Sequence, residues 1–93
     1  MSNRVIELKI WPNFFRDVSS GLKKFEIRAD DRGYDVGHIL KLREWDPNRE
    51  IYTGAFVLTP ILYRTSIATG LIDGFVVLSL GPLTHGNVAP SLE

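Results

Sequence analysis

The sequence SGLKKFEIR, residues 20–28, contains the point at which the spacing of apolar residues changes from helical to extended. Before it, apolar residues between positions 14 and 22 recur at roughly helical spacing, and Gly21 is a natural residue to end a helix. After it, Phe25 and Ile27 alternate with charged residues. We therefore expect a strand at 23–28 with its apolar residues on one face and its charges on the other.

The rest of the chain predicts four more strands around one helix. The expected strands span 4–10, 23–28, 39–45, 50–63 and 74–80, and the helix spans 12–21 with Pro12 in its first turn. Loops are expected at 29–37, 46–48 and 64–73. Pro60 lies inside the fourth strand and requires a bulge, a bend or an edge position. This order predicts an α+β, mainly β fold: a small, partly open β-barrel with the helix closing one end.

The length of 93 residues suffices for one domain, which we expect to span 1–81. After Gly81 the composition changes to Pro, Gly, Asn, Ser and Thr, so residues 82–93 are expected to form a loosely held, flexible tail. Residues 1–9 contain no apolar run that would act as a signal peptide, and the apolar run at 74–80 is too short to cross a bilayer. We expect a cytoplasmic protein without membrane contact.

The charges balance, with 11 basic and 11 acidic residues. A broad cationic surface of the kind that binds nucleic acid non-specifically is therefore not expected, and any site for a polyanion must come from local clustering. The chain has no cysteine, which excludes disulfide bonds and thiolate metal sites. His38 and His85 have no spacing that suggests metal ligation, so neither a metal nor a cofactor is predicted.

Several motifs in order resemble one superfamily. Gly21, Lys23, Glu26 and Arg28 match the ASCH signature G-x-K-x-x-E-x-R. The runs at 7–12, 31–37, 42–47, 52–54 and 74–80 narrow the resemblance to a short ASCH-like family of unknown function found in phages and in bacteria carrying prophages. The resemblance implies a PUA-like barrel with a cleft lined by the segment after the helix, linked to RNA or nucleotide handling. It also implies a bacterial cytoplasm or a phage-infected cell as the location.

One branch of that superfamily is a small amidohydrolase that acts on acetylated cytidine with a Lys, a Thr nucleophile and a distant Glu. The Lys falls on Lys23, but Glu26 stands at the Thr position, and the loop at 64–73 replaces the segment that should bring the distant Glu. The resemblance therefore favours binding over catalysis. If the protein is an enzyme, Lys23 and Glu26 are its expected acid–base pair.

The candidate binding residues are the charges that follow the helix. Arg28 would bind a phosphate or a base edge in a bidentate way, Glu26 would accept from an exocyclic amine, and Lys23 or Lys24 would hold a phosphate. The alternative is a solvated strand face with ion pairs of little energetic value, with Lys24 the first expected to be plain surface. Arg32 would either bind ligand or brace its loop.

Aromatic residues supply the candidates for stacking a base, namely Trp11, Trp45 and Tyr34. Most aromatic residues of a small domain belong to its core. The five phenylalanines are accordingly assigned to the core: Phe14, Phe15, Phe25, Phe56 and Phe75.

Three functions remain open. The first is a module that binds RNA, single-stranded nucleic acid or a nucleotide, the second is a small hydrolase of a modified nucleoside, and the third is a phage accessory protein that binds a host protein. The motif resemblance favours the first.

Overall fold

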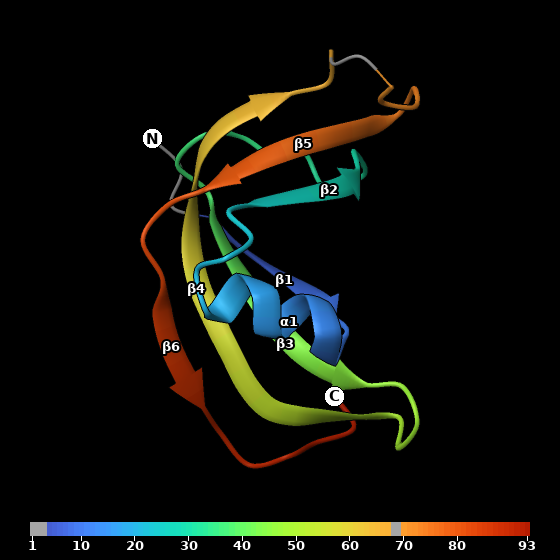
Figure 1. Ribbon diagram of the computed structural model, residues 1–93, viewed down its shortest axis with the longest axis vertical. Helices are drawn as coiled ribbons and strands as arrows, with labels where there is room; N and C mark the ends of the chain where they lie inside the picture. The colour runs from blue at the N-terminus through green and yellow to red at the C-terminus, as the bar shows by residue number, and fades with distance from the viewer. Residues whose placement is uncertain (1–3, 68–69) are drawn as a thin grey trace.

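Six strands and one helix build the protein, and the computed structural model describes them over residues 4–67 and 70–93 (Figure 1). The elements are β1 (Val5–Ile10), α1 (Pro12–Ser19), β2 (Phe25–Ala29), β3 (Ile39–Asp46), β4 (Ile51–Thr65), β5 (Phe75–Leu80) and β6 (Thr84–Asn87). Residues 1–3 and 68–69, which belong to the expected N-terminal segment and the expected loop at 64–73, lie outside the described residues. Within the described ranges, no helix combines the length and the apolar character that a membrane crossing requires.

The strands form one sheet in the order β1-β3-β4-β5-β2, with β6 added to β4. β1 and β3 are parallel, and every other neighbouring pair is antiparallel. β4 is long enough to join two parts of the sheet. Its first part pairs with β3, and its last residues pair with β5. The mainly β fold with one short helix is therefore confirmed. The predicted barrel is corrected to an open sheet, because β1 and β2 end the strand order without pairing to each other.

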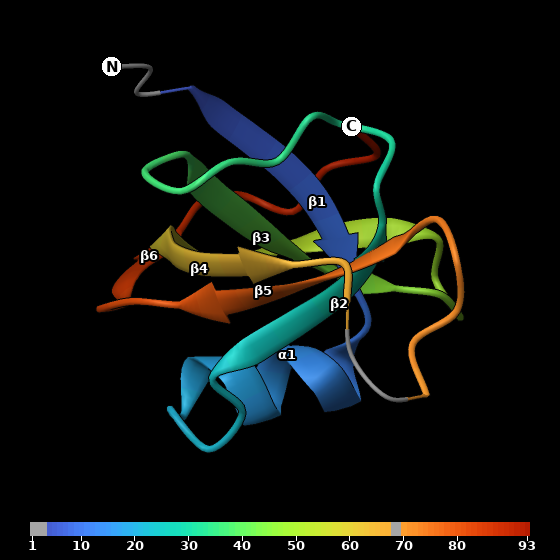
Figure 2. The same cartoon turned by 90° about the horizontal axis from the view of Figure 1, so that it is seen from above.

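The core lies on the concave side of this curled sheet, where α1 also packs (Figures 1 and 2). Alternate residues of β1, β3 and β5 point inward and are buried, as the period of two requires. α1 contributes Phe15 and Val18, which lie on one face of the helix because they are three positions apart. Trp11 precedes the helix, and its carbonyl accepts the amide of Phe15 over 2.8 Å.

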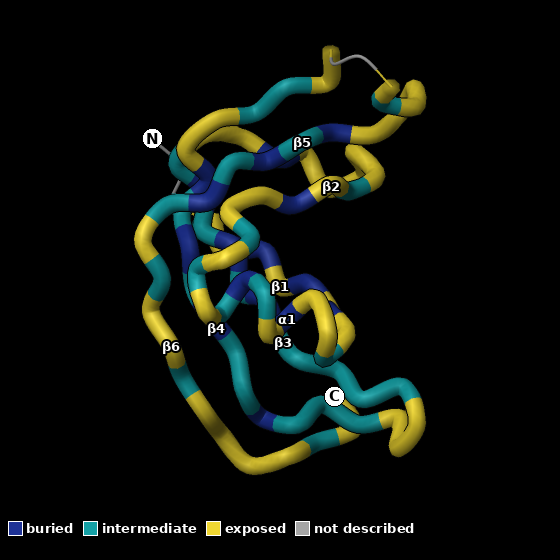
Figure 3. The backbone as a smooth tube through the Cα atoms, in the orientation of Figure 1, coloured by how far each residue is buried: buried dark blue, intermediate teal, exposed yellow. Residues whose placement is uncertain are grey.

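β2 turns the opposite face to the core from the one predicted. Phe25 and Ile27 are 44% and 50% exposed, whereas Glu26 is only 3% exposed. Figure 3 shows buried backbone between exposed stretches along β2. The cause is the pairing with β5, in which Glu26 lies opposite the buried Leu78. Directly opposed residues of an antiparallel pair share a face, so Glu26 points inward with Leu78. The alternation was predicted correctly, but the buried face was wrong.

The core assignment of the phenylalanines is also corrected. Of the five, Phe15 alone is buried, Phe56 is half-buried, and the remaining three are exposed. Phe14 and Phe25 lie around the opening between β1 and β2, where the sheet does not continue to cover them. An open sheet of this size cannot bury all of its aromatic residues on one side.

Pro60 lies where one edge of β4 changes its partner. β6 pairs with residues 55–58 of β4, and β5 pairs with residues 61–65. The Pro60 carbonyl accepts the Gly81 amide over 2.9 Å. The nitrogen and the carbonyl of one strand residue face the same edge, so the missing N–H of Pro60 faces the gap between β6 and β5. The ladder loses no bond there, and a register irregularity follows between Ile61 and Tyr63, as predicted.

The C-terminal segment is paired with the sheet rather than loosely held. β6 extends the edge of β4, the Val88 amide donates to Gly54 O, and Tyr52 and Ser91 exchange two backbone hydrogen bonds. The expected tail at 82–93 is thereby corrected. The segment was misjudged because its attachment is made by backbone groups, which any composition supplies.

Candidate functional site

A cleft of about 450 Å³ opens between the two ends of the sheet. Residues of β1, α1, β2 and the segment that joins α1 to β2 line it: Lys9, Ile10, Trp11, Phe14, Lys23, Glu26, Ile27 and Arg28. Its volume lies in the range of about 300–1,000 Å³ that is typical of small-molecule sites. Four residues predicted from sequence meet here, namely Trp11, Lys23, Glu26 and Arg28.

Arg28 of β2 and Arg32 of the loop that follows β2 reach across the opening to β1. Arg28 Nη2 donates to the carbonyl of Lys9 over 3.1 Å, and Arg32 Nη1 donates to the carbonyl of Glu7 over 3.3 Å. Both carbonyls lie on the edge of β1 away from β3, two residues apart, as the period of a strand requires. The guanidinium groups thus satisfy edge carbonyls that a neighbouring strand would otherwise bind, and Arg28 is fixed at the floor of the cleft.

Glu26 is the buried centre of an ionic triad in this cleft. Lys23 Nζ donates to Glu26 Oε1 over 3.0 Å, and Arg28 Nε donates to Glu26 Oε2 over 2.9 Å. A buried carboxylate without such partners would carry a large desolvation cost. Each oxygen has one charged donor here, and a carboxylate oxygen has two acceptor positions in all.

Aromatic rings form the open walls of the cleft. Trp11 is 53% exposed and Phe14 is 49% exposed. Lys23 Nζ lies 5.3 Å from the ring centroids of both Phe14 and Phe25, so the cation is close to both rings. A planar apolar group entering the cleft would cover ring surface that water now contacts.

Lys9 connects the cleft to the outer face of the sheet. Its Nζ lies 4.0 Å from the centroid of the Trp45 ring, which meets Tyr52 edge to face at 4.9 Å. Trp45, a predicted stacking residue, therefore lies outside the cleft and joins it only through Lys9.

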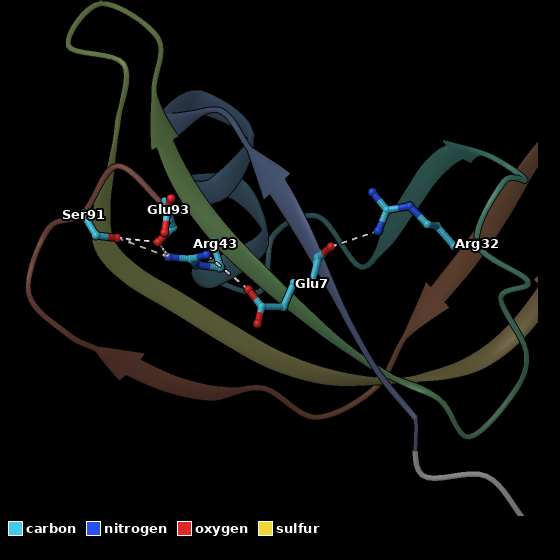
Figure 4. A network of polar contacts seen from close by, with 5 residues as sticks. All are labelled: Glu7, Arg32, Arg43, Ser91 and Glu93. Atoms are coloured by element: carbon cyan, nitrogen blue, oxygen red, sulfur yellow. Dashed lines mark hydrogen bonds and ion pairs between the residues drawn. The ribbon is translucent and has the colours of Figure 1, made fainter.

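Two other predicted residues are also outside the cleft. Lys24 is exposed and borders a second hollow between the end of α1 and the β5–β6 connection. Arg32 is exposed, lies 3.8 Å from Asp31 Oδ1 and bonds to β1 through its own guanidinium, which fits the bracing role. Figure 4 shows this contact continuing through Glu7, whose carboxylate accepts from Arg43 Nη1 over 3.2 Å. Arg43 in turn donates to Ser91 Oγ and Glu93 O.

Tyr34 offers no open ring, because it is buried in the core. Burial raises the pKa of its phenol above the usual value of 10.0, while the nearby guanidinium groups of Arg28 and Arg32 act in the opposite direction. His38 is buried with no hydrogen-bond partner at Nδ1 among the described residues, and His85 Nε2 lies 2.7 Å from Ser19 O. Over residues 4–67 and 70–93, no group of three or more His, Cys, Asp or Glu side chains is placed to hold a metal.

Sequence reasoning missed four residues of the cleft: Lys9, Ile10, Phe14 and Ile27. Phe14 and Ile27 were assigned to buried faces because they are apolar. The position of Lys9 could have been found, since it points away from the core in β1 and lies two residues before Trp11. Its proximity to Arg28 depends on the tertiary fold and has no signal in the sequence.

The residues that line the cleft lie inside the region that a known protein family matches. The family described as Domain of unknown function (DUF3850) matches residues 5–80, which include the whole cleft. A protein of Escherichia phage P2, described as "Uncharacterized 12.9 kDa protein in GpA 3'region", is 33% identical over 73 residues. That match covers 78% of this chain and 65% of the phage protein, so the chain spans less than two thirds of that relative. The expected kinship with phage proteins of unknown function is confirmed.

Proposed function

The chain belongs to the family described as Domain of unknown function (DUF3850), so its own cleft has to indicate the function, and we propose that this cleft binds a nucleotide, either free or within a single RNA strand. The observation that carries the proposal is the triad of Lys23, Glu26 and Arg28 beneath exposed aromatic rings. Such a site combines charged groups for the phosphate and the base edge with a surface for the base.

Charge supports this assignment. Lys23 and Arg28 line the cleft against the single carboxylate of Glu26, and the ammonium of Lys9 lies over Trp45 beside it, although the chain as a whole has no net charge. The positive charge is therefore concentrated where the ligand would enter, and a phosphate is attracted there rather than to the surface in general. Arg28 also retains donors on Nη1, which can bind a phosphate oxygen.

The motif resemblance to the ASCH superfamily supports the same proposal. Lys23, Glu26 and Arg28 belong to the signature segment that in that superfamily is linked to nucleotide or RNA handling. We extend the proposal to the architecture and regard the curled sheet as a PUA-like barrel left open between β1 and β2. The amidohydrolase alternative is less well supported, because Glu26 stands at the position of its Thr nucleophile and binds a cation through each oxygen.

Binding by purified protein and matched variants tests the proposal. Fluorescence anisotropy with labelled single-stranded RNA, and calorimetry with nucleoside monophosphates, would be run at two salt concentrations. The lysine pair gives the matched comparison, since Lys23 lines the cleft and its neighbour Lys24 does not. We expect Lys23→Met to weaken binding and its salt dependence, and Lys24→Met to leave both near the original values.

Trp11→Ala tests the aromatic wall independently of charge. We expect affinity to fall by about 5- to 150-fold, because stacking of a base on an aromatic ring contributes about 1–3 kcal/mol. Trp11 is half exposed, so its removal should change the folded state little. Absence of saturable binding to every strand and nucleotide would refute the proposal, as would equal losses in Lys23→Met and Lys24→Met. Product analysis with acetylated cytidine, and capture of host proteins, would then test the two alternatives.

A further inference from the structure

We infer that the base bound in the cleft is guanine. The inference rests on the proposed function and adds the identity of the base. It comes from the order of donors and acceptors along the triad, in which Lys23, Glu26 Oε1, Glu26 Oε2 and Arg28 follow one another. This order presents a donor, two acceptors and a donor.

Each member of the triad keeps hydrogen-bonding capacity for a ligand. A carboxylate has two acceptor positions on each oxygen, and one position on each is used by Lys23 or Arg28. Lys23 gives Glu26 one of its three N–H groups. Arg28 bonds to Glu26 through Nε and to Lys9 O through Nη2, and the N–H groups of Nη1 remain as further donors.

Guanine has the complementary edge. Its O6 is an acceptor, and its N1–H and its 2-amino group are adjacent donors. The two donors match the two oxygens of Glu26, and O6 then lies beside one of the flanking cations. Cytosine and adenine offer one amino group followed by an acceptor, and uracil offers a single N–H between two acceptors. None of these three bases can donate to both oxygens through neighbouring groups.

Burial of Glu26 makes it unfavourable to bind a base that cannot donate to both carboxylate oxygens. The Glu26 carboxylate is almost fully enclosed, so an oxygen that a ligand covers without bonding loses its remaining access to water. Sites built to hydrogen-bond a particular group reject analogues that lack it more strongly than apolar pockets reject a missing methyl group. The ring face of guanine would meet the open wall at Trp11 and Phe14.

Calorimetric titration with five nucleoside 5′-monophosphates tests the inference. We expect GMP to bind about tenfold or more tightly than AMP, CMP and UMP, because each lost hydrogen bond to a charged group has an effect of this order. IMP keeps O6 and N1–H but lacks the 2-amino group, so its affinity should lie between GMP and AMP. Labelled RNA strands that differ in one guanine would show the same order if the nucleotide is part of a strand.

Variants assign the preference to the carboxylate. Glu26→Gln replaces one acceptor with a donor and should abolish the preference for GMP over AMP. Glu26→Asp keeps both oxygens and should retain the preference at lower affinity, which separates recognition from any change in stability. Glu7→Gln removes a carboxylate outside the cleft and should bind like the original protein.

The outcomes separate the two proposals. Absence of binding by every nucleotide and strand refutes the nucleotide-binding function itself. Equal binding of all five nucleotides, or tighter binding of CMP than GMP, refutes the inference about guanine and leaves the nucleotide-binding function standing. A preference for GMP that survives in Glu26→Gln also refutes the inference, because the discrimination would then come from another group.

Discussion

Glu26 receives its cations from residues close to it in the sequence, Lys23 three positions before and Arg28 two positions after. A buried ion pair often gives no more stability than apolar residues of similar volume, because desolvation offsets most of the attraction. Stability alone therefore explains the triad poorly. The proposed recognition of a ligand would give a charged residue a role at this core-facing position in β2.

Tyr34 should make the stability of the fold depend on alkaline pH. Burial raises the pKa of its phenol in the folded protein above 10.0. Below that pH the phenol is protonated in both states and contributes no slope. As the pH rises further, the unfolded chain loses the proton first, so the free energy of unfolding falls until the folded phenol also ionises.

Urea denaturation at a series of pH values from neutral to strongly alkaline would measure this slope. Tyr34→Phe should flatten the fall, whereas Tyr63→Phe, which removes an exposed phenol, should leave it unchanged. An identical alkaline slope in the Tyr34→Phe variant and the original protein would contradict the prediction.

At the scale of elements, β4 organises the sheet through close backbone contacts. It pairs with β3, β5 and β6, and the segment after β6 crosses it closely at Gly54. Gly54 has a φ of +102°, a conformation that residues with a Cβ rarely adopt. Gly86 in β6 leaves room for the Phe56 ring instead. Gly54 thus lets the backbone after β6 lie close to β4, and Gly86 lets the Phe56 ring of β4 lie against β6.

Alanine at these glycines should have unequal effects. In Gly54→Ala the new Cβ would lie 1.9 Å from Val88 O, a backbone atom, and we expect a loss of about 3 kcal/mol or more in the free energy of unfolding. In Gly86→Ala it would lie 2.1 Å from Phe56 Cζ, the end of a side chain that can move, and we expect about 1–3 kcal/mol. Chemical denaturation measures both.

A second substitution checks the cause at Gly86. Phe56→Leu in the Gly86→Ala background should recover part of the loss, because it removes the ring that the new methyl group meets. The same substitution should not rescue Gly54→Ala, whose obstacle is backbone. A larger loss for Gly86→Ala than for Gly54→Ala would contradict this account of the contacts.

The molecule as a whole is a sheet that curls without closing (Figures 1 and 2). Its two ends, β1 and β2, are joined by the side chains of Arg28 and Arg32 rather than by a backbone ladder. The cleft exists because no backbone ladder closes the gap between β1 and β2. The same residue, Arg28, therefore holds the ends together and lines the cleft.

Removal of the C-terminal segment should uncover an edge of the sheet. A chain ending at Leu83 lacks β6, so residues 55–58 of β4 lose their partners on the edge away from β3. Unpaired strand edges favour association with other chains, and we expect lower stability and concentration-dependent self-association. Light scattering after size-exclusion chromatography and thermal unfolding would measure the two effects. A chain ending at Ser91 keeps β6 and the pairing with Tyr52, and should behave like the original.

Loss of β6 without a change in stability or association would contradict that prediction. It would mean that the added strand contributes little to the protection of β4. β6 pairs with β4 and contributes no residue to the cleft lining, so ligand binding by the shortened chain would show whether the cleft depends on this edge.

The sequence by itself determined the local elements and part of the candidate site. The periods of apolar residues located the helix and five of the strands within a few residues, because these periods follow from backbone geometry alone. The members of the triad could also be named from the sequence, because Lys23, Glu26 and Arg28 are close along the chain and belong to one motif.

The tertiary structure decided which face of β2 is buried, which residue completes the cleft and where the C-terminal segment lies. Alternation shows which residues share a face, but pairing with β5 decides that Glu26, not Phe25, faces inward. Lys9 meets Arg28 only because the ends of the sheet approach each other. β6 could not be predicted from the sequence, because backbone pairing requires no particular side chains. Local periodicity follows from the covalent chain, whereas these contacts join residues distant in sequence.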